Sequence, residues 1–223
     1  MTEPGPTEWS TGATDVEPAG MGPWSEAESG PVPTDPRFDP ELLAEGDRRN
    51  VVDAYRYWRR EAIVADIDTR RHPLHVAIEN FGNDANIGAV VRTANAFAVD
   101  TVHIVGRRRW NRRGAMVTDR YQRLTHHDST EALLDWAAGA GLTVVAVDNV
   151  PGAVRLEETE LPRQALLLFG QEGPGISPAA RDGAALTVSI AQFGSTRSIN
   201  AAVAAGIAMH AWIRRWADLT RAW

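Results

Sequence analysis

The sequence predicts an α/β domain in which a parallel β-sheet is covered by helices on both faces. The first observation is that strand-like and helix-like segments alternate along the chain from residue 74 onward. The second is that the strand-like segments are apolar almost without interruption, as in ALLLFG at 165–170. Such segments are typical of parallel strands that are buried on both sides.

The strands follow from short apolar runs rich in β-branched residues, and the helices from longer segments with helical periodicity. Asp128 or Ser129 can cap the helix that continues to about Ala138, because either side chain can accept a hydrogen bond from the first turn. The expected strands are 74–80, 101–106, 143–149, 165–170 and 186–190, and the other expected helices are 86–99, a short one within 177–185, and one from Ser198 to about Leu219.

The N-terminal part differs in composition. Residues 1–40 are rich in Pro, Gly, Glu, Ser and Thr and lack a periodic apolar pattern, so we expect a disordered acidic tail. Residues 41–66 carry apolar and aromatic residues among charges, which indicates a helix. The expected organisation is therefore a tail (1–40), a helical extension (41–73) and a main domain (74–223).

Charge and composition narrow the function. Residues 1–46 hold ten acidic residues and one arginine, so the remaining 19 acidic and 22 basic residues give the rest of the chain a charge of +3. All 23 basic residues are arginine, and cysteine is absent, which excludes disulfide scaffolds and cysteine nucleophiles. No apolar run is long enough to span a membrane and no signal peptide is evident, so we expect a cytoplasmic protein.

Two glycine-bearing loops invite comparison with nucleotide-binding motifs. A P-loop needs a lysine, and the chain has none. A dinucleotide fingerprint needs GxGxxG after the first strand, where this chain has only Gly82 and Gly88. The loop after residue 169 therefore indicates a pocket lined by main chain for a small neutral or cationic ligand.

Three segments together carry a more specific pattern. They are Asn86-x-Gly88-Ala89-x-x-Arg92, then LFGQEGPG at 168–175, then Ile190-x-x-x-Gly194-x-x-x-Ser198-Ile199-Asn200 before an alanine-rich helix. In these segments the sequence resembles the TrmH-like branch of the SPOUT superfamily, RNA 2′-O-ribose methyltransferases that use S-adenosylmethionine. The resemblance covers about residues 74–215.

This resemblance implies a deep trefoil knot near the C-terminus and a homodimer. It also implies a cofactor site and a set of catalytic residues. The implied cofactor-binding residues are Phe169, Gly170, Gly175, Ile190 and Ile199, and the implied catalytic residues are Asn86, Arg92, Glu172, Ser198 and Asn200.

The chemistry of these residues leaves some roles open. A guanidinium is a poor general base, so we expect Arg92 to clamp a phosphate and stabilise the developing alkoxide, with Glu172 as its candidate partner. Asn86 can be either a helix cap or a catalytic group, and Ser198 can cap the last helix. Asn200, expected inside that helix, is the stronger functional candidate.

A third feature is the run GRRRWNRRGAMVTDRYQR at 106–123, with Trp110 and Tyr121 among seven arginines. Arginine binds phosphates and aromatic rings stack on unpaired bases, so this run predicts an RNA-binding surface. The implied RNA-binding residues are Arg107, Arg108, Arg109, Trp110, Arg112, Arg113 and Arg120.

The combined prediction is a ribose-2′-O-methyltransferase that acts on tRNA rather than rRNA. An rRNA-specific ribose methyltransferase and a catalytically idle knotted RNA-binding protein are the alternatives. The chain departs from the family at Ala191-Gln192, where relatives have Pro-Met, and at Ile199, where they have Leu. Because the implied cofactor contacts there are mostly backbone, these departures bear on the choice of substrate more than on cofactor binding. We expect no metal, and the adjacent His126 and His127 are expected to be ordinary surface or core residues.

Overall fold

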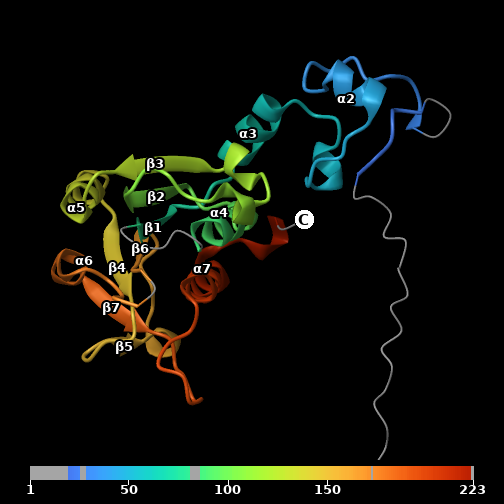
Figure 1. The fold of residues 1–223 in the computed structure, drawn as a ribbon. Helices are drawn as coiled ribbons and strands as arrows, with labels where there is room; N and C mark the ends of the chain where they lie inside the picture. Colours follow the sequence, from blue (N-terminus) through green and yellow to red (C-terminus); the bar gives the residue numbers. More distant parts are fainter. Residues whose placement is uncertain (1–19, 26–28, 81–85, 172, 222–223) are drawn as a thin grey trace, which may run out of the picture. The chain divides into compact units, whose positions relative to one another are not determined.

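The computed structural model describes residues 20–25, 29–80, 86–171 and 173–221. These residues form two compact units, one ending at Arg59 and the other beginning at Arg60 (Figure 1). The second unit contains the sheet and the three motifs described above.

The sheet of the second unit has seven strands in the order β3-β2-β1-β6-β4-β7-β5, and every pairing is parallel. The predicted parallel sheet is confirmed. All five expected strands are present, and two short strands, β3 and β5, were not expected. The strands are β1 (Leu74–Asn80), β2 (Thr101–Gly106), β3 (Arg123–His127), β4 (Thr143–Val147), β5 (Val154–Arg155), β6 (Ala165–Phe169) and β7 (Leu186–Ser189).

Helices cover both faces, as predicted. Apolar side chains of α4 and α7 join one buried cluster with alternate residues of the strands, and those of α5 and α6 join a second cluster with the residues between them. Figure 1 shows the two layers on opposite sides of the sheet. The helices are α3 (Arg60–Asp68), α4 (Ile87–Ala96), α5 (Thr130–Gly139), α6 (Pro178–Gly183) and α7 (Ala201–Trp216).

The first unit is built around a buried carboxylate and aromatic rings. Asp47 is fully buried and accepts hydrogen bonds from the Arg49 guanidinium (2.6 and 2.8 Å) and from the backbone N–H of Tyr57 (2.9 Å). The Trp24 ring packs edge-on against Tyr57 and Phe38. Residues 20–25 and 29–40, which the sequence analysis places in a disordered tail, thus pack within this unit, because their aromatic rings find partners later in the chain.

The continuous helix expected over 41–66 is wrong. Helix α2 (Pro40–Glu45) ends at Gly46, whose φ of +95° is incompatible with a helix. A 3₁₀ turn, Asp53–Tyr55, follows, and Tyr57 has a φ of +62°, so the helix restarts only at Arg60. The apolar residues that suggested one helix are divided among α2, the 3₁₀ turn, α3 and the residues between these elements.

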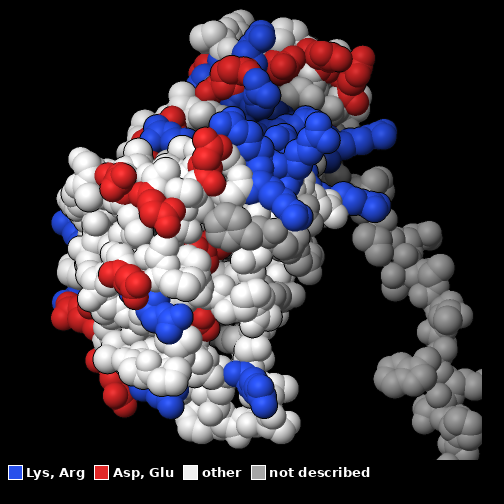
Figure 2. All heavy atoms as spheres, turned by 60° about the vertical axis from the view of Figure 1, so that its left-hand side comes forward, with Lys and Arg blue, Asp and Glu red and all other residues white. Residues whose placement is uncertain are grey.

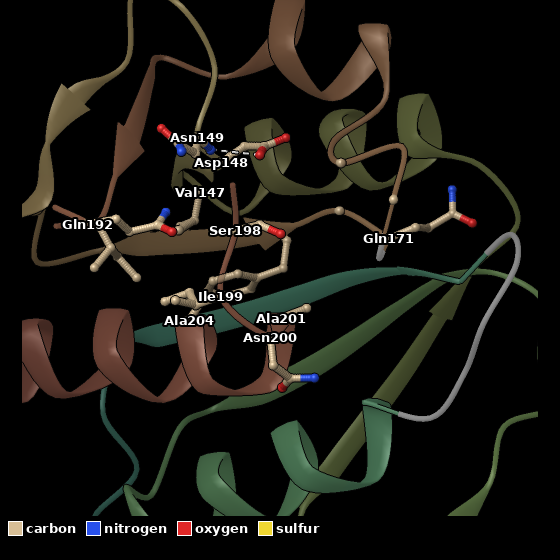
Figure 3. A pocket seen from close by; sticks show the side chains of 15 residues that line it. Val147, Asp148, Asn149, Gln171, Gln192, Ser198, Ile199, Asn200, Ala201 and Ala204 are labelled. Atoms are coloured by element: carbon tan, nitrogen blue, oxygen red, sulfur yellow. Dashed lines mark hydrogen bonds between the residues drawn. The ribbon is translucent and has the colours of Figure 1, made fainter. Parts of the chain in front are cut away.

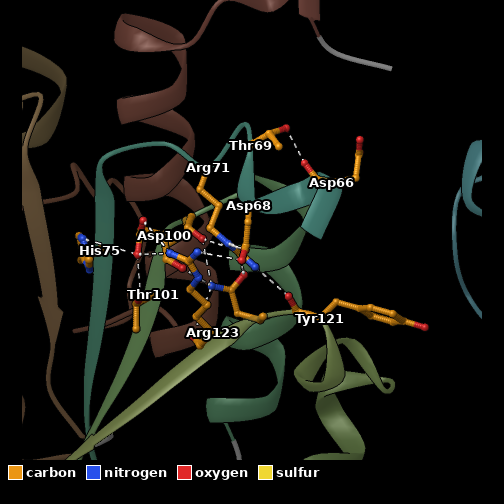
Figure 4. Close-up of polar contacts among 11 residues, drawn as sticks. Asp66, Asp68, Thr69, Arg71, His75, Asp100, Thr101, Tyr121 and Arg123 are labelled. Carbon is orange, nitrogen blue, oxygen red and sulfur yellow. Dashed lines mark hydrogen bonds and ion pairs between the residues drawn. The ribbon is translucent and has the colours of Figure 1, made fainter. Parts of the chain in front are cut away.

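A network of ion pairs joins α3 to the beginnings of β2 and β3 (Figure 4). The Arg71 guanidinium is almost fully buried and donates to Asp68 (2.6 Å) and to the backbone oxygen of Tyr121 (2.9 Å). Arg123 pairs with Asp68 (2.8 Å) and lies 3.5 Å from Asp100. Tyr121 and Arg123 lie at the C-terminal end of the arginine-rich segment (106–123). Because both are bonded within this network, the network holds that end of the segment in place.

Three histidines form a hydrogen-bonded chain across β1, β2 and β3. His75 Nδ1 lies 3.1 Å from His103 Nε2, and His103 Nδ1 lies 2.9 Å from His127 Nε2. The Trp136 ring of α5 packs against all three imidazoles, and His75 Nε2 lies 4.0 Å from Asp100. Burial lowers the pKa of His103 to about 3, with further lowering from its two histidine neighbours. His127 is therefore a buried core residue, which is one of the two positions, surface or core, expected from the sequence.

We expect the free energy of unfolding to decrease between pH 7 and pH 5. Unfolded histidine has a pKa of 6.5 and folded His103 one of about 3, so the stabilisation is complete above pH 6.5 and is lost as the pH falls from there toward 3. His103 alone then contributes a loss of about 2 kcal/mol at pH 5. Urea unfolding at both pH values measures this difference.

His103→Gln should reduce that pH dependence, whatever its effect on stability at pH 7. The matched control is His210→Gln, because His210 is exposed on α7. If His103→Gln left the difference between pH 7 and pH 5 unchanged, the buried histidine chain would not be the cause.

Candidate active site

A cavity of about 530 Å³ lies at the carboxyl ends of β4, β6 and β7. In parallel sheets, ligands bind at this edge, where loops rather than strands present their backbone groups. The five residues predicted to bind a cofactor all line it, as do Ser198 and Asn200 (Figure 3). The lining residues are Val147, Asp148, Asn149, Phe169, Gly170, Gln171, Gly173, Gly175, Ile190, Gln192, Ser198, Ile199, Asn200, Ala201 and Ala204.

The glycine loop after β6 folds back on itself. Gln171 and Gly175 exchange two backbone hydrogen bonds of 3.1 Å. A Cβ atom on Gly170 would lie 2.1 Å from the carbonyl carbon of Gly175, so no other residue fits there without moving backbone. Gly173 and Gly175 have φ values of +94° and +73°, which favour glycine. The glycines are therefore needed to bring two backbone segments together at the edge of the cavity.

Two carboxylates that the sequence analysis missed hold the far end of this loop. Asp148 Oδ2 accepts from the N–H of Ile176 (2.9 Å), and its Oδ1 accepts from the N–H of Asn149 (2.7 Å). Glu79, 2% exposed, accepts from the N–H and hydroxyl of Ser177 (2.8 and 2.5 Å) and from the Thr130 hydroxyl. Asp148 directly follows β4, and Glu79 is the penultimate residue of β1. A charged residue at the end of an apolar strand is the sequence signal that could have identified both.

Asn200 has a structural role that the sequence analysis did not expect. Helix α7 begins at Ala201, so Asn200 is its N-cap, and its Oδ1 accepts from the N–H groups of Ala202 and Val203 (3.0 and 3.2 Å). Its Nδ2 donates to Asn86 Oδ1 (2.8 Å). The expectation that Asn200 lies inside the helix, with Ser198 as a possible cap, is wrong, because the helix starts later than the alanine-rich pattern suggested.

Asn86 is the N-cap residue of α4 by position, as one of the two alternatives had it, but its side chain makes no cap hydrogen bond. Its amide oxygen instead accepts the bond from Asn200 and joins α4 to the wall of the cavity. Two candidate catalytic residues are thus in direct contact, although 114 positions separate them in sequence.

Arg92 is exposed on α4 and does not line the cavity. Within the described ranges it forms no ion pair, and its candidate partner Glu172 lies outside those ranges. A Cβ atom on Gly88 would lie 2.7 Å from the backbone nitrogen of Ala115, so this side of α4 packs directly on the arginine-rich segment. Because Arg92 follows Gly88 by one helical turn, it lies on the same side of α4.

The arginine-rich segment contains two 3₁₀ turns, Arg112–Ala115 and Thr118–Arg120. The six predicted RNA-binding arginines (107, 108, 109, 112, 113 and 120) are all exposed. Figure 2 shows arginine side chains gathered on one part of the surface, whereas charges elsewhere on the visible face are scattered. Trp110 is half-buried with the Arg112 guanidinium 5.6 Å from its ring centre. Tyr121 is buried, so its ring is not available for stacking on a base.

Neither a metal centre nor a membrane span is found in the part of the chain that the structure describes. Its histidine and acidic side chains form no group of three or more that could hold a metal ion. None of its helices is both long and apolar enough to cross a membrane.

A family model described as SpoU rRNA Methylase matches residues 73–210. An uncharacterized tRNA/rRNA methyltransferase of Mycolicibacterium vanbaalenii is 32% identical over 78% of this chain and 58% of its own length. A protein of Mycolicibacterium smegmatis with the same description is 33% identical over 71% of this chain and 52% of its own length. The chain thus spans about half the length of the curated relatives it matches.

Solved structures of similar fold include the TrmH/SpoU tRNA modifying enzyme of A. aeolicus, with a TM-score of 0.63 and 24% identity over 70% of this chain and 82% of that one. The SpoU methyltransferase AviRb of Streptomyces viridochromogenes, in complex with AdoMet, has a TM-score of 0.59 and 25% identity, over 67% of this chain and 60% of that one. A structure that addresses 2-OH methylation of C/U34 on tRNA has a TM-score of 0.57 and 29% identity, over 65% of this chain and 96% of that one.

Proposed function

The chain belongs to the SpoU rRNA Methylase family, and from this premise we propose that it transfers a methyl group from S-adenosylmethionine to a ribose 2′-hydroxyl of RNA. The observation that carries this proposal is the cavity at the ends of β4, β6 and β7, lined by all five predicted cofactor residues.

The cavity fits S-adenosylmethionine, the cofactor of SpoU methyltransferases. Its volume lies within the ~300–1,000 Å³ typical of small-molecule sites. Among its described lining residues, Asp148 is the only charged one, which suits a ligand that carries cationic sulfonium and ammonium groups better than one with phosphates. When bound, the cofactor supplies an activated methyl group, so the protein needs no metal for this chemistry.

The remaining tasks are to hold the ribose and to ease loss of its proton. Arg92 can clamp the adjacent phosphate and stabilise the developing oxyanion from the exposed side of α4. The Asn200–Asn86 pair and Ser198 hold the cavity wall nearest to α4, and Glu172 is retained as the partner that orients Arg92. Phosphate or water then accepts the proton, because no imidazole is among the lining residues that the structure describes.

The exposed arginines of residues 107–120 supply the RNA-binding surface in this proposal. Six guanidinium groups on one segment favour a polyanion, and the half-buried Trp110 offers an aromatic face to an unpaired base. The contact between Gly88 and Ala115 attaches this segment to the helix that carries Arg92. RNA bound along the segment is therefore held close to the proposed phosphate clamp.

We propose tRNA as the substrate, with an rRNA-specific ribose methyltransferase as the alternative. The relatives are described as tRNA/rRNA methyltransferases, and one similar structure concerns 2-OH methylation of tRNA, which supports a tRNA ribose without excluding rRNA.

We further propose a cytoplasmic homodimer with a trefoil knot. Val203 and Ile207, 54% and 39% exposed on α7, offer an apolar surface for a second copy. The knot is supported by the return of the chain from β7 to the glycine loop, where residues 198–201 line the same cavity.

The main domain is proposed to begin near residue 74, after the N-terminal segment (1–40) and the extension (41–73).

The test is transfer of radiolabelled methyl from S-adenosylmethionine to bulk tRNA and, separately, to rRNA from a strain that lacks the gene. The labelled RNA is then digested to nucleosides. We expect label in a 2′-O-methylnucleoside of the tRNA pool. Label on a base would overturn the ribose assignment, label in rRNA alone would select the alternative substrate, and cofactor binding without transfer would favour the idle RNA-binding protein.

A further inference from the structure

The segment between β7 and α7 forms one wall of the cavity. Ile190 and Gln192 line it at one end, and residues 198–201 line it at the other. We refer to residues 191–197 as the rim loop. Figure 1 shows this part of the chain, coloured orange to red, projecting from the sheet before it enters α7.

The rim loop is fixed at both ends. The N–H of Ala191 donates to Glu157 Oε1 (3.0 Å), and the side-chain amide of Asn149 donates to the backbone oxygen of Arg197 (3.1 Å). Residues 193–196 between these anchors are all exposed. The tip of the loop is therefore held beside the cavity while its own side chains face solvent.

Phe193 lies at this tip and is 97% exposed. A single exposed apolar side chain is common on protein surfaces, but this one lies beside a cavity and shares its loop with an exposed arginine. Gln192, its neighbour in sequence, lines the cavity, and Arg197 at the other end of the loop is exposed and forms no ion pair in the described ranges.

The rim loop thus carries an exposed aromatic ring and, four positions later, an exposed guanidinium without an ion pair in the described ranges, a combination that matches the chemistry of a nucleotide. The ring stacks on a base of any sequence, and the guanidinium binds a phosphate. A protein surface would instead require a wider apolar patch, but Gly194, Ser195 and Thr196 follow Phe193.

We propose that Phe193 stacks on an unpaired base of the substrate RNA next to the nucleotide that enters the site, with Arg197 on the adjoining phosphate. This inference rests on the proposed function and adds a determinant of substrate positioning separate from the arginine-rich segment.

The experiment compares Phe193→Ala and Phe193→Trp with the wild-type chain, using the RNA pool that accepts label. We expect Phe193→Ala to raise the KM for that RNA about tenfold. Phe193→Trp should restore it, because a larger ring preserves stacking. The Kd for S-adenosylmethionine, measured by calorimetry, should stay within about twofold in both variants, since Phe193 does not line the cavity. Leu219→Ala is the control, because Leu219 is another exposed apolar residue (64%) far from the rim loop in sequence.

The outcomes separate the two proposals. If the wild-type chain transfers no methyl to RNA, the proposed function fails before any variant is compared. If it does and Phe193→Ala has an unchanged KM for RNA, the stacking role is wrong while the function stands. If Phe193→Ala dissociates a dimer in sedimentation analysis, the ring belongs to an interface between copies, which also overturns the inference.

Discussion

Replacement of Arg92 by lysine should lower kcat for methyl transfer about 100-fold, and replacement by alanine about 1,000-fold. Lysine keeps the positive charge but cannot grip a phosphate with two parallel hydrogen bonds, so it loses the geometry of the clamp. The Kd for S-adenosylmethionine should stay unchanged in both variants, because Arg92 is exposed and lies outside the cofactor cavity. Single-turnover kinetics with the labelled cofactor, combined with calorimetry, measures both quantities.

The matched control is Arg214→Lys, since Arg214 is also an exposed helical arginine. It should retain kcat within about twofold. An Arg92→Lys variant that kept most of the turnover would show that charge alone suffices and that the two-pronged clamp is wrong. A variant that lost cofactor affinity would contradict the separation of Arg92 from the cavity.

The sheet could be predicted because its central strands are continuous apolar runs. Strand β3 was not predicted because its sequence, RLTHH, is polar. Its residues are held by partners elsewhere in the chain, since Arg123 pairs with Asp68 and His127 with His103. Local pattern carries no information about such pairings, so an edge strand of this kind is recognised only once the fold is known.

The candidate site could be predicted to a similar extent. The glycine loop after an apolar strand is a local signal for a pocket, and the resemblance to a known family then identified the individual cofactor residues that line the cavity. Glu79 and Asp148 were not identified, because they act on Ser177 and Ile176, 98 and 28 positions away. Asn200 was placed inside α7 because alanine has high helical propensity, whereas its side chain caps a helix that begins at Ala201, three positions after the expected start at Ser198.

The second large effect is expected at the glycine loop. Gly170→Ala should weaken S-adenosylmethionine binding at least about 100-fold, because the added Cβ atom would lie 2.1 Å from Gly175 C and 2.2 Å from both Gly175 O and Ile176 N. All three are backbone atoms, and Ile176 is also held by Asp148 (2.9 Å), so the loop cannot yield without opening the cavity. Calorimetric titration with the cofactor measures the loss, and circular dichroism checks that the chain remains folded.

Alanine substitutions at three glycines of different crowding separate a specific loss of cofactor binding from general unfolding. Gly175→Ala should be milder than Gly170→Ala, since the atoms nearest to its Cβ atom would belong to the Asp148 side chain rather than to backbone, although the φ of +73° adds strain. Gly194→Ala is the control, because a Cβ atom there would meet nothing within 4 Å and its backbone is not left-handed. The expected order of affinities is therefore Gly194→Ala, then Gly175→Ala, then Gly170→Ala, because an added Cβ atom meets nothing at Gly194, a side chain at Gly175 and backbone at Gly170. Equal losses at positions 170 and 194 would mean that the cavity does not bind the cofactor through this loop.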